Sequence, residues 1–107
     1  EQEREALSAI RANLAALAAR ARSRVAALSV MHLKARQEPL DLILLDPPYH
    51  TGAGEVALDR LLRLGWIGEA TWMALETAAT EDPQIAGLAI ETSRKVGKAR
   101  LTLFRLG

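Results

Sequence analysis

Four consecutive residues, Asp46-Pro47-Pro48-Tyr49, combine the groups that chemistry on a nucleic-acid base requires. The amino group on a base is a poor nucleophile, because its lone pair is delocalised into the ring. A carboxylate and a backbone carbonyl that both accept hydrogen bonds from this amine can direct its lone pair at an electrophilic methyl group. Asp46 offers the carboxylate, and the carbonyl of Asp46 or Pro47 offers the second acceptor.

The prolines and the tyrosine have separate tasks in this hypothesis. Pro47 and Pro48 restrict the backbone and so fix the carbonyl groups outward. Tyr49 offers a ring against which an extruded base can stack, an interaction typically worth about 1–3 kcal/mol per base. The reaction depends on orientation and needs no metal. The simplest alternative is an ordinary turn at the end of a strand, with a surface tyrosine.

The aliphatic run that precedes the turn, from Leu40 to Asp46, must position it. A near-continuous aliphatic run is typical of a strand buried on both faces of a parallel sheet, and the two prolines must end it. Working residues in such sheets gather at the carboxyl ends of strands, where this turn falls. After a glycine-bearing loop, a helix is expected from Glu55 to Leu64, ended by Gly65.

The rest of the chain predicts five further elements. They are a helix from about Glu3 to Arg22, a short strand within Val25 to Met31, and strands from Trp72 to Ala78, Leu88 to Thr92 and Ala99 to Arg105. The last two strands are expected to form a hairpin around Gly97. This order predicts an α/β fold with a mainly parallel sheet and a C-terminal antiparallel hairpin.

Composition sets the broad class of the protein. Half of the 107 residues are hydrophobic and 25% are charged, which is typical of one globular domain covering residues 1–107. There is no cysteine, so a disulfide framework and a thiolate metal site are excluded, and a reducing compartment such as the cytoplasm is expected. No apolar run approaches the roughly 20 residues of a membrane-spanning helix, so no membrane partner is expected.

Global charge gives no indication of a nucleic-acid partner, because 14 lysines and arginines stand against 13 aspartates and glutamates. Local charge does. Four cations cluster around the expected hairpin and are candidates for salt-dependent contacts with RNA phosphates: Arg94, Lys95, Lys98 and Arg100. The alternative is a charged hairpin that keeps the protein soluble. Trp66 and Trp72 are interpreted as core or interface residues.

The motif and its surroundings resemble a known family. An aliphatic strand ending in (Asp/Asn)-Pro-Pro-(Tyr/Phe) is the signature of the amino-group methyltransferases, and residues 40–49 (LDLILLDPPY) match it. The flanking segments look most like the bacterial small-subunit ribosomal RNA guanine-N2 methyltransferases. Residues 64–66, the strand with Glu76 and residues 97–103 follow in the family's order, and residues 10–14 resemble the helix after its second strand.

This resemblance implies a Rossmann-like class I methyltransferase fold and S-adenosylmethionine as the cofactor. The catalytic residues would be Asp46, Pro47, Pro48 and Tyr49. Glu1 sits where the family's acidic residue reaches the ribose hydroxyls of the cofactor. The implied partner is ribosomal RNA or the small ribosomal subunit.

The chain also departs from the family pattern, because nothing in it matches the family's first strand and glycine-rich cofactor loop. We therefore expect a single methyltransferase-like domain that lacks the N-terminal part of the fold and binds the cofactor poorly by itself. In the family, the first strand lies beside the strand that ends in Asp46. Its absence predicts an exposed edge on the strand that ends in Asp46, through which a homodimer can form.

Two other functions are consistent with the same residues. A non-catalytic remnant would bind RNA or a partner protein through the hairpin and the exposed sheet edge. A DNA methyltransferase that modifies adenine N6 or cytosine N4 would share the four-residue motif, although the flanking resemblance favours RNA. Saturable cofactor binding separates an enzyme from a remnant.

Overall fold

The computed structural model describes residue 12, residues 24–26 and residues 38–107. The predicted helix from Glu3 to Arg22 and the candidate cofactor residue Glu1 lie outside the described residues, apart from the helical residue 12. Most of the expected strand from Val25 to Met31 lies outside them as well. The fold below therefore concerns the segment that contains the candidate catalytic turn.

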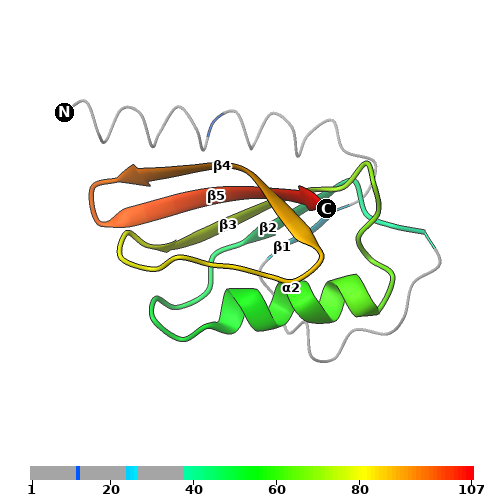
Figure 1. Ribbon diagram of the computed structural model, residues 1–107, viewed down its shortest axis with the longest axis horizontal. Helices are drawn as coiled ribbons and strands as arrows, with labels where there is room; N and C mark the ends of the chain where they lie inside the picture. The colour runs from blue at the N-terminus through cyan, green and yellow to red at the C-terminus, as the bar shows by residue number, and fades with distance from the viewer. Residues whose placement is uncertain (1–11, 13–23, 27–37) are drawn as a thin grey trace.

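The described strands form one five-stranded mixed sheet in the order β1-β2-β3-β5-β4, and helix α2 packs along it (Figure 1). The elements are β1 (Arg24–Ala26), β2 (Leu42–Leu45), α2 (Ala53–Arg63), β3 (Trp72–Ala78), β4 (Leu88–Val96) and β5 (Ala99–Leu106). Strands β1, β2 and β3 are parallel, whereas β5 is antiparallel to both β3 and β4. The predicted C-terminal hairpin is confirmed, but the described sheet is evenly mixed and not mainly parallel.

Strand β2 is shorter than the predicted run from Leu40 to Asp46. Leu40 lies outside the strand, and its backbone N–H is bonded to the Trp66 carbonyl at 2.8 Å. After β2, Pro47 cannot donate a ladder hydrogen bond, and the strand ends at Leu45, one residue before the predicted end at Asp46. The strand is parallel to β3 with Leu45 opposite Leu75, so its carboxyl end lies level with the second half of β3.

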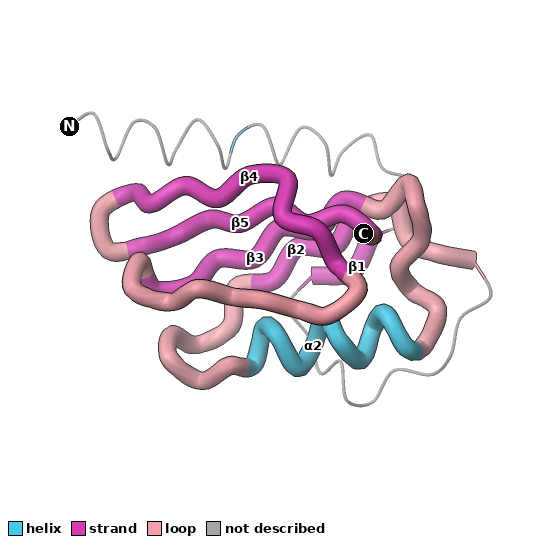
Figure 2. The backbone as a smooth tube through the Cα atoms, in the orientation of Figure 1, coloured by secondary structure: helices cyan, strands magenta, loops and turns pink. Residues whose placement is uncertain are grey.

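The main core lies between the sheet and α2, which covers one face of the sheet (Figure 2). The fully buried side chains that build it come from three strands and the helix: Ile43, Leu58, Leu61, Met73, Leu75 and Phe104. Leu58 and Leu61 lie three residues apart on α2, as expected of an amphipathic helix. The predicted stop is confirmed, because Gly65 has φ 85° and its backbone N–H is bonded to the Leu62 carbonyl.

The hairpin differs from the prediction in the length of its first strand. Strand β4 runs to Val96 and not to Thr92, and the turn is confined to Gly97 (φ 60°) and Lys98. A register shift between Ile90 and Thr92 marks a bulge. Strand β4 is exposed along almost all of its length. It is therefore an edge strand, and its polar residues and bulge are features that oppose pairing with another sheet.

The edge of β2 that the sequence leaves open is occupied. Strand β1 pairs with it in parallel, from Arg24 opposite Leu42 to Ala26 opposite Leu44. The prediction of an exposed edge on this strand is therefore wrong for three of the four residues of β2. The physical reason is that a buried aliphatic strand is stable when it is paired on both sides, and a parallel strand of the same chain provides the second pairing here. A homodimer through a sheet edge stays a prediction.

Candidate functional site

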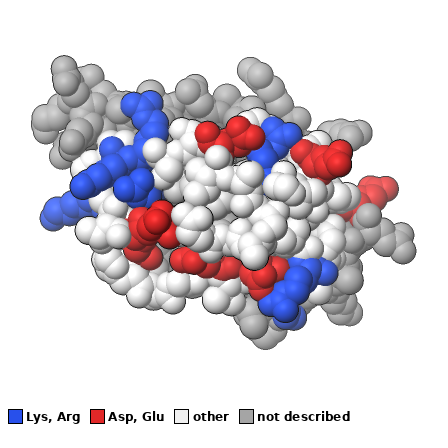
Figure 3. Space-filling view, viewed as in Figure 1, with Lys and Arg blue, Asp and Glu red and all other residues white. Residues whose placement is uncertain are grey.

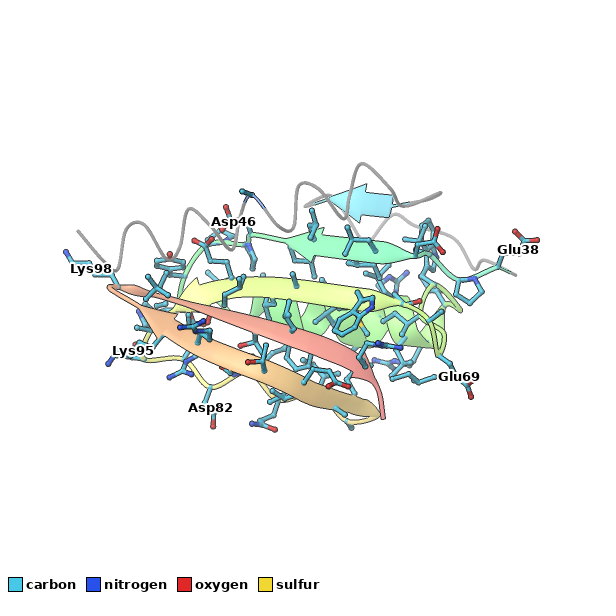
Figure 4. The ribbon with its side chains drawn as sticks, turned by 90° about the horizontal axis from the view of Figure 1, so that it is seen from above. Glu38, Asp46, Glu69, Asp82, Lys95 and Lys98 are labelled. Atoms are coloured by element: carbon cyan, nitrogen blue, oxygen red, sulfur yellow. The ribbon has the colours of Figure 1, made fainter. Side chains whose placement is uncertain are left out.

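The turn from Asp46 to Tyr49 lies at the carboxyl end of β2, the central of the three parallel strands. Asp46, Pro48 and Tyr49 are exposed, and Pro47 is half-buried. Figure 4 shows Asp46 just beyond the arrowhead of β2, at the end of the sheet opposite Glu38 and Glu69. The predicted location of the motif is confirmed, because the parallel strands present their carboxyl ends here.

A short hydrogen-bonded bridge fixes the backbone after the prolines. The Thr51 hydroxyl donates to the Pro48 carbonyl at 2.8 Å, and the Ala53 N–H donates to the same hydroxyl at 3.2 Å. The carbonyls of Asp46 and Pro47 accept no hydrogen bond from another described residue. The second acceptor that the chemistry requires can therefore be either of these two carbonyls, as the sequence predicts, whereas the Pro48 carbonyl is already occupied.

Tyr49 folds back toward the neighbouring strand. Its hydroxyl donates to Oε2 of Glu76 on β3 at 3.1 Å, while 41% of the residue's surface stays exposed. A ring with an anchored hydroxyl and an uncovered surface is suited to stacking against a flat partner.

The carboxylate of Glu81 contacts His50, the residue that follows Tyr49. Glu81 accepts a hydrogen bond from the Ala78 N–H at 2.7 Å. This bond, together with the backbone N–H and the imidazole of His50, lowers the pKa of Glu81 below its ordinary value. His50 has φ 60°, a left-handed conformation that is uncommon for a non-glycine residue. The contacts of Glu81 help to hold the loop in this conformation.

A cavity of about 240 Å³ borders the turn on the side of α2. Its lining is apolar except for one carboxylate: Leu45, Asp46, Pro47, Pro48, Ala53, Gly54 and Ala57. The cavity is smaller than the roughly 300–1,000 Å³ of typical pockets for drug-sized ligands. The cavity is therefore small for a whole nucleotide cofactor, and Asp46 is its one charged lining residue.

Gly54 sets the spacing between α2 and the sheet at this cavity. A Cβ on Gly54 would lie 2.4 Å from Cδ1 of Leu75, which is fully buried on β3. Only glycine permits so close an approach of the helix to the strand. The first turn of α2 is therefore held against β3, beside the candidate catalytic turn.

The predicted RNA-binding cations lie at the same end of the sheet as Asp46. Figure 4 shows Lys95 and Lys98 at the tip of the hairpin, and Figure 3 shows blue atoms gathered at this end of the molecule. Arg94, Lys95 and Lys98 are exposed. Arg100 differs, because it is half-buried and donates to the Ala79 carbonyl at 3.3 Å and to the Ser93 hydroxyl at 2.9 Å.

The two tryptophans lie away from the turn. Trp66 packs against the core, and Trp72 begins β3 at the opposite end of that strand from Glu76. The guanidinium of Arg105 sits 4.2 Å from the centre of the Trp72 ring, in a cation–π contact. The interpretation of Trp66 as a core residue is confirmed, whereas Trp72 is 37% exposed and lies outside the core, so an interface role for it stays a prediction.

Sequence reasoning placed the motif but missed most of its supports. In the sequence, Glu76 is a landmark of the family order and does not stand out as the partner of Tyr49. Gly54 belongs to the glycine-bearing loop, and neither Thr51 nor Glu81 stands out as a support of the turn. Thr51 carried a local signal, since a threonine just before a helix often bonds nearby backbone groups. The contacts of Gly54 and Glu81 depend on tertiary packing and gave no such signal.

The fold and the site together combine a mixed α/β sheet with an Asp-Pro-Pro-Tyr turn at the carboxyl end of a parallel strand, which is the arrangement that the sequence analysis expects of an amino-group methyltransferase. The family comparison agrees. The model of the family described as "Conserved hypothetical protein 95" matches residues 1–105. The chain belongs to this family of methyltransferases, and the expected membership of a methyltransferase family is thereby confirmed.

Solved structures support the same fold. A "putative methylase" from Haemophilus influenzae matches with a TM-score of 0.60 and 22% identity, over 68% of this chain and 43% of that chain. A "putative methyltransferase" from Escherichia coli matches with a TM-score of 0.63 and 20% identity, over 74% and 46%. A "conserved hypothetical protein" from Streptococcus pyogenes matches with a TM-score of 0.60 and 23% identity, over 74% and 49%.

The chain thus spans less than half the length of each of these three structures. Among proteins with curated descriptions, none matches it. In the described part of the chain, α2 is the one complete helix, and no helix there has the length and apolarity to cross a membrane.

Proposed function

We propose that this chain carries the catalytic turn of an S-adenosylmethionine-dependent methyltransferase whose acceptor is the exocyclic N2 amine of a guanine in small-subunit ribosomal RNA. The observation that carries the proposal is the geometry of the turn. The Asp46 carboxylate and the carbonyls of Asp46 and Pro47 lie at the open carboxyl end of β2, beside the anchored ring of Tyr49.

The residues of the turn orient the acceptor. The Asp46 carboxylate accepts one N–H of the amine and the carbonyl of Asp46 or Pro47 accepts the other, which directs the nitrogen lone pair away from the ring. S-Adenosylmethionine would supply an electrophilic methyl group when bound. The Asp46 carboxylate or water would take the proton that the amine gives up on methylation. Tyr49 holds the base by stacking on one face.

The described residues fit the acceptor and not the whole cofactor. The cavity beside Asp46 is too small for a complete S-adenosylmethionine, and Asp46 is the one acidic residue that lines it. The predicted ribose contact, Glu1, lies outside the described residues. Cofactor binding is therefore proposed from family membership, and residues beyond the described ones must provide most of it.

RNA is the proposed partner for two reasons. The flanking resemblance favours a ribosomal RNA methyltransferase over an adenine-N6 or cytosine-N4 DNA methyltransferase. In addition, Arg94, Lys95 and Lys98 present exposed positive charge at the end of the sheet where Asp46 lies, which suits phosphates that flank a target base. Arg100 contributes mainly by stabilising the hairpin, because its guanidinium is bonded within the protein.

The decisive experiment compares Asp46→Ala with Asp82→Ala in the full-length protein. Asp82 is an exposed carboxylate on the loop after β3, so its loss changes the charge equally without touching the turn. Transfer of labelled methyl to unmodified small-subunit ribosomal RNA is measured and the product nucleoside identified. We expect Asp46→Ala to lower kcat by about 10²–10³ and Asp82→Ala to leave it unchanged. Equal activity of both variants contradicts the assignment of Asp46.

Calorimetric titration with S-adenosylhomocysteine tests the cofactor separately. Saturable binding that Asp46→Ala retains supports an enzyme whose acceptor site alone has been damaged. Absence of binding in the full-length protein contradicts the enzyme and favours the non-catalytic remnant. Methylated adenine or cytosine in DNA, without methylated guanine in ribosomal RNA, contradicts the proposed substrate and favours the DNA methyltransferase.

A further inference from the structure

Glu76 lies outside the predicted motif but contacts it directly. On β3 it follows Leu75, which is the register partner of Leu45, the last residue of β2. Glu76 therefore lies level with the point at which β2 gives way to the turn. The side chain of Tyr49, within the turn, lies against β3, and its hydroxyl donates a hydrogen bond to Glu76 Oε2 at 3.1 Å.

The sheet fixes the position of Glu76. Strand β3 is paired on both sides, with Leu75 opposite Leu45 and Glu76 opposite Leu101. The residues on either side of Glu76 in the chain are buried, and Glu76 itself is half-buried. A carboxylate on the central strand of a five-stranded sheet has less freedom than one on a loop, so its oxygen is a fixed point for the hydroxyl.

The ring of Tyr49 needs such a fixed point. With 41% of its surface exposed, the residue is restrained less by packing than a core aromatic would be. Its backbone belongs to a turn that two prolines and the Thr51 bridge restrain, while its hydroxyl is held by β3. The ring is thus restrained at both ends, with part of its surface left open.

We propose that Glu76 is a positioning residue that holds Tyr49 ready to stack on the target base. This inference rests on the proposed function, because it gives the ring a base as its partner. A side chain that is ordered before binding does not have to be ordered on binding, so the bond from Tyr49 to Glu76 increases affinity for the RNA. Its loss should raise KM for the RNA by about two- to tenfold and leave kcat nearly unchanged.

The test uses four variants of the full-length protein: Glu76→Ala, Glu76→Gln, Tyr49→Phe and the double variant Glu76→Ala/Tyr49→Phe. We expect Glu76→Ala and Tyr49→Phe each to raise KM by about two- to tenfold, and the double variant to match the single ones, because all three lack the same bond. Glu76→Gln should restore KM, since its amide oxygen also accepts the hydroxyl. A uniform fall in kcat and thermal midpoint for both Glu76 variants would mean a merely structural role.

A second measurement does not depend on methyl transfer. Tyr49 is the one tyrosine of this chain, and its signal in ¹³C-tyrosine-labelled protein is assigned by its loss in Tyr49→Phe. We expect the order parameter of the ring to fall in Glu76→Ala and to stay at the wild-type value in Glu76→Gln. An unchanged ring in Glu76→Ala overturns the positioning role even if the protein methylates RNA. A loosened ring without any methyl transfer supports the positioning of Tyr49 and refutes the proposed function.

Discussion

Substituting Gly54 by alanine tests whether the close approach of α2 to the sheet is required. The added Cβ would lie 2.4 Å from Cδ1 of Leu75, whereas carbon atoms in contact normally lie about 3.5–4.0 Å apart. One of the two groups must therefore move by at least about 1 Å. Leu75 is fully buried in the core cluster, so its side chain has little room to give way. The helix must shift, or the leucine must leave its preferred rotamer.

The magnitude follows from two opposing effects. Overpacking a well-packed core costs about 1–3 kcal/mol, while alanine in place of glycine favours a helix by at most about 1 kcal/mol. The favourable effect is small here because Gly54 lies in the first turn of α2. We therefore expect Gly54→Ala to lower the free energy of unfolding by about 1–2 kcal/mol, measured by urea unfolding of the full-length protein.

A double-mutant cycle with Leu75→Val identifies the cause. Removal of one methylene alone should destabilise the wild-type protein by about 0.5–1.5 kcal/mol. In the Gly54→Ala background the same change makes room for the new methyl group, so it should cost less or be stabilising, with a coupling of about 0.5–3 kcal/mol. Additive effects would show that Leu75 is not the obstacle. A Gly54→Ala variant as stable as the wild type would refute the reasoning altogether.

Two further predictions concern charges. The pKa of Glu81 is lowered in the folded state, so its carboxylate stabilises the fold above the ordinary glutamate pKa, and this stability is lost as the pH falls through the lowered value. Wild type should therefore be more stable than Glu81→Gln at pH 7 and equally stable near pH 3 in urea unfolding, and a constant difference would contradict the role of its contacts with His50 and the backbone. Binding of RNA weakens as salt is added, and the slope of log K against log salt concentration measures how many phosphate contacts are made. Replacing both Lys95 and Lys98 by alanine should reduce the magnitude of this slope by about two. Arg63→Ala, at the far end of α2, should not change the slope, and equal slopes in all variants would place the RNA elsewhere.

The fold could be predicted where the sequence carries a local physical signal. Pro47 ends β2 because it cannot continue a ladder, and Gly97 forms the hairpin turn because the backbone there has positive φ. The length of β4 could not be predicted in the same way. Residues 93–95 are polar and were interpreted as part of the turn, but an exposed edge strand needs no apolar alternation to pair with β5. The pairing of β1 with β2 also carried no local signal.

Only the contiguous motif of the site could be predicted, because its other residues reach the motif through the register of the strands. The motif is contiguous, but its partner Glu76 lies 27 residues after Tyr49 and reaches it because Leu45 pairs with Leu75. A slip of one residue would exchange the faces of β3, sending Leu75 out of the core and Glu76 into it. The apolar side chains that fill the core therefore also determine which residue meets the tyrosine. Core substitutions that disturb this register should therefore weaken the contact of Tyr49 with Glu76 more than they change the position of Asp46.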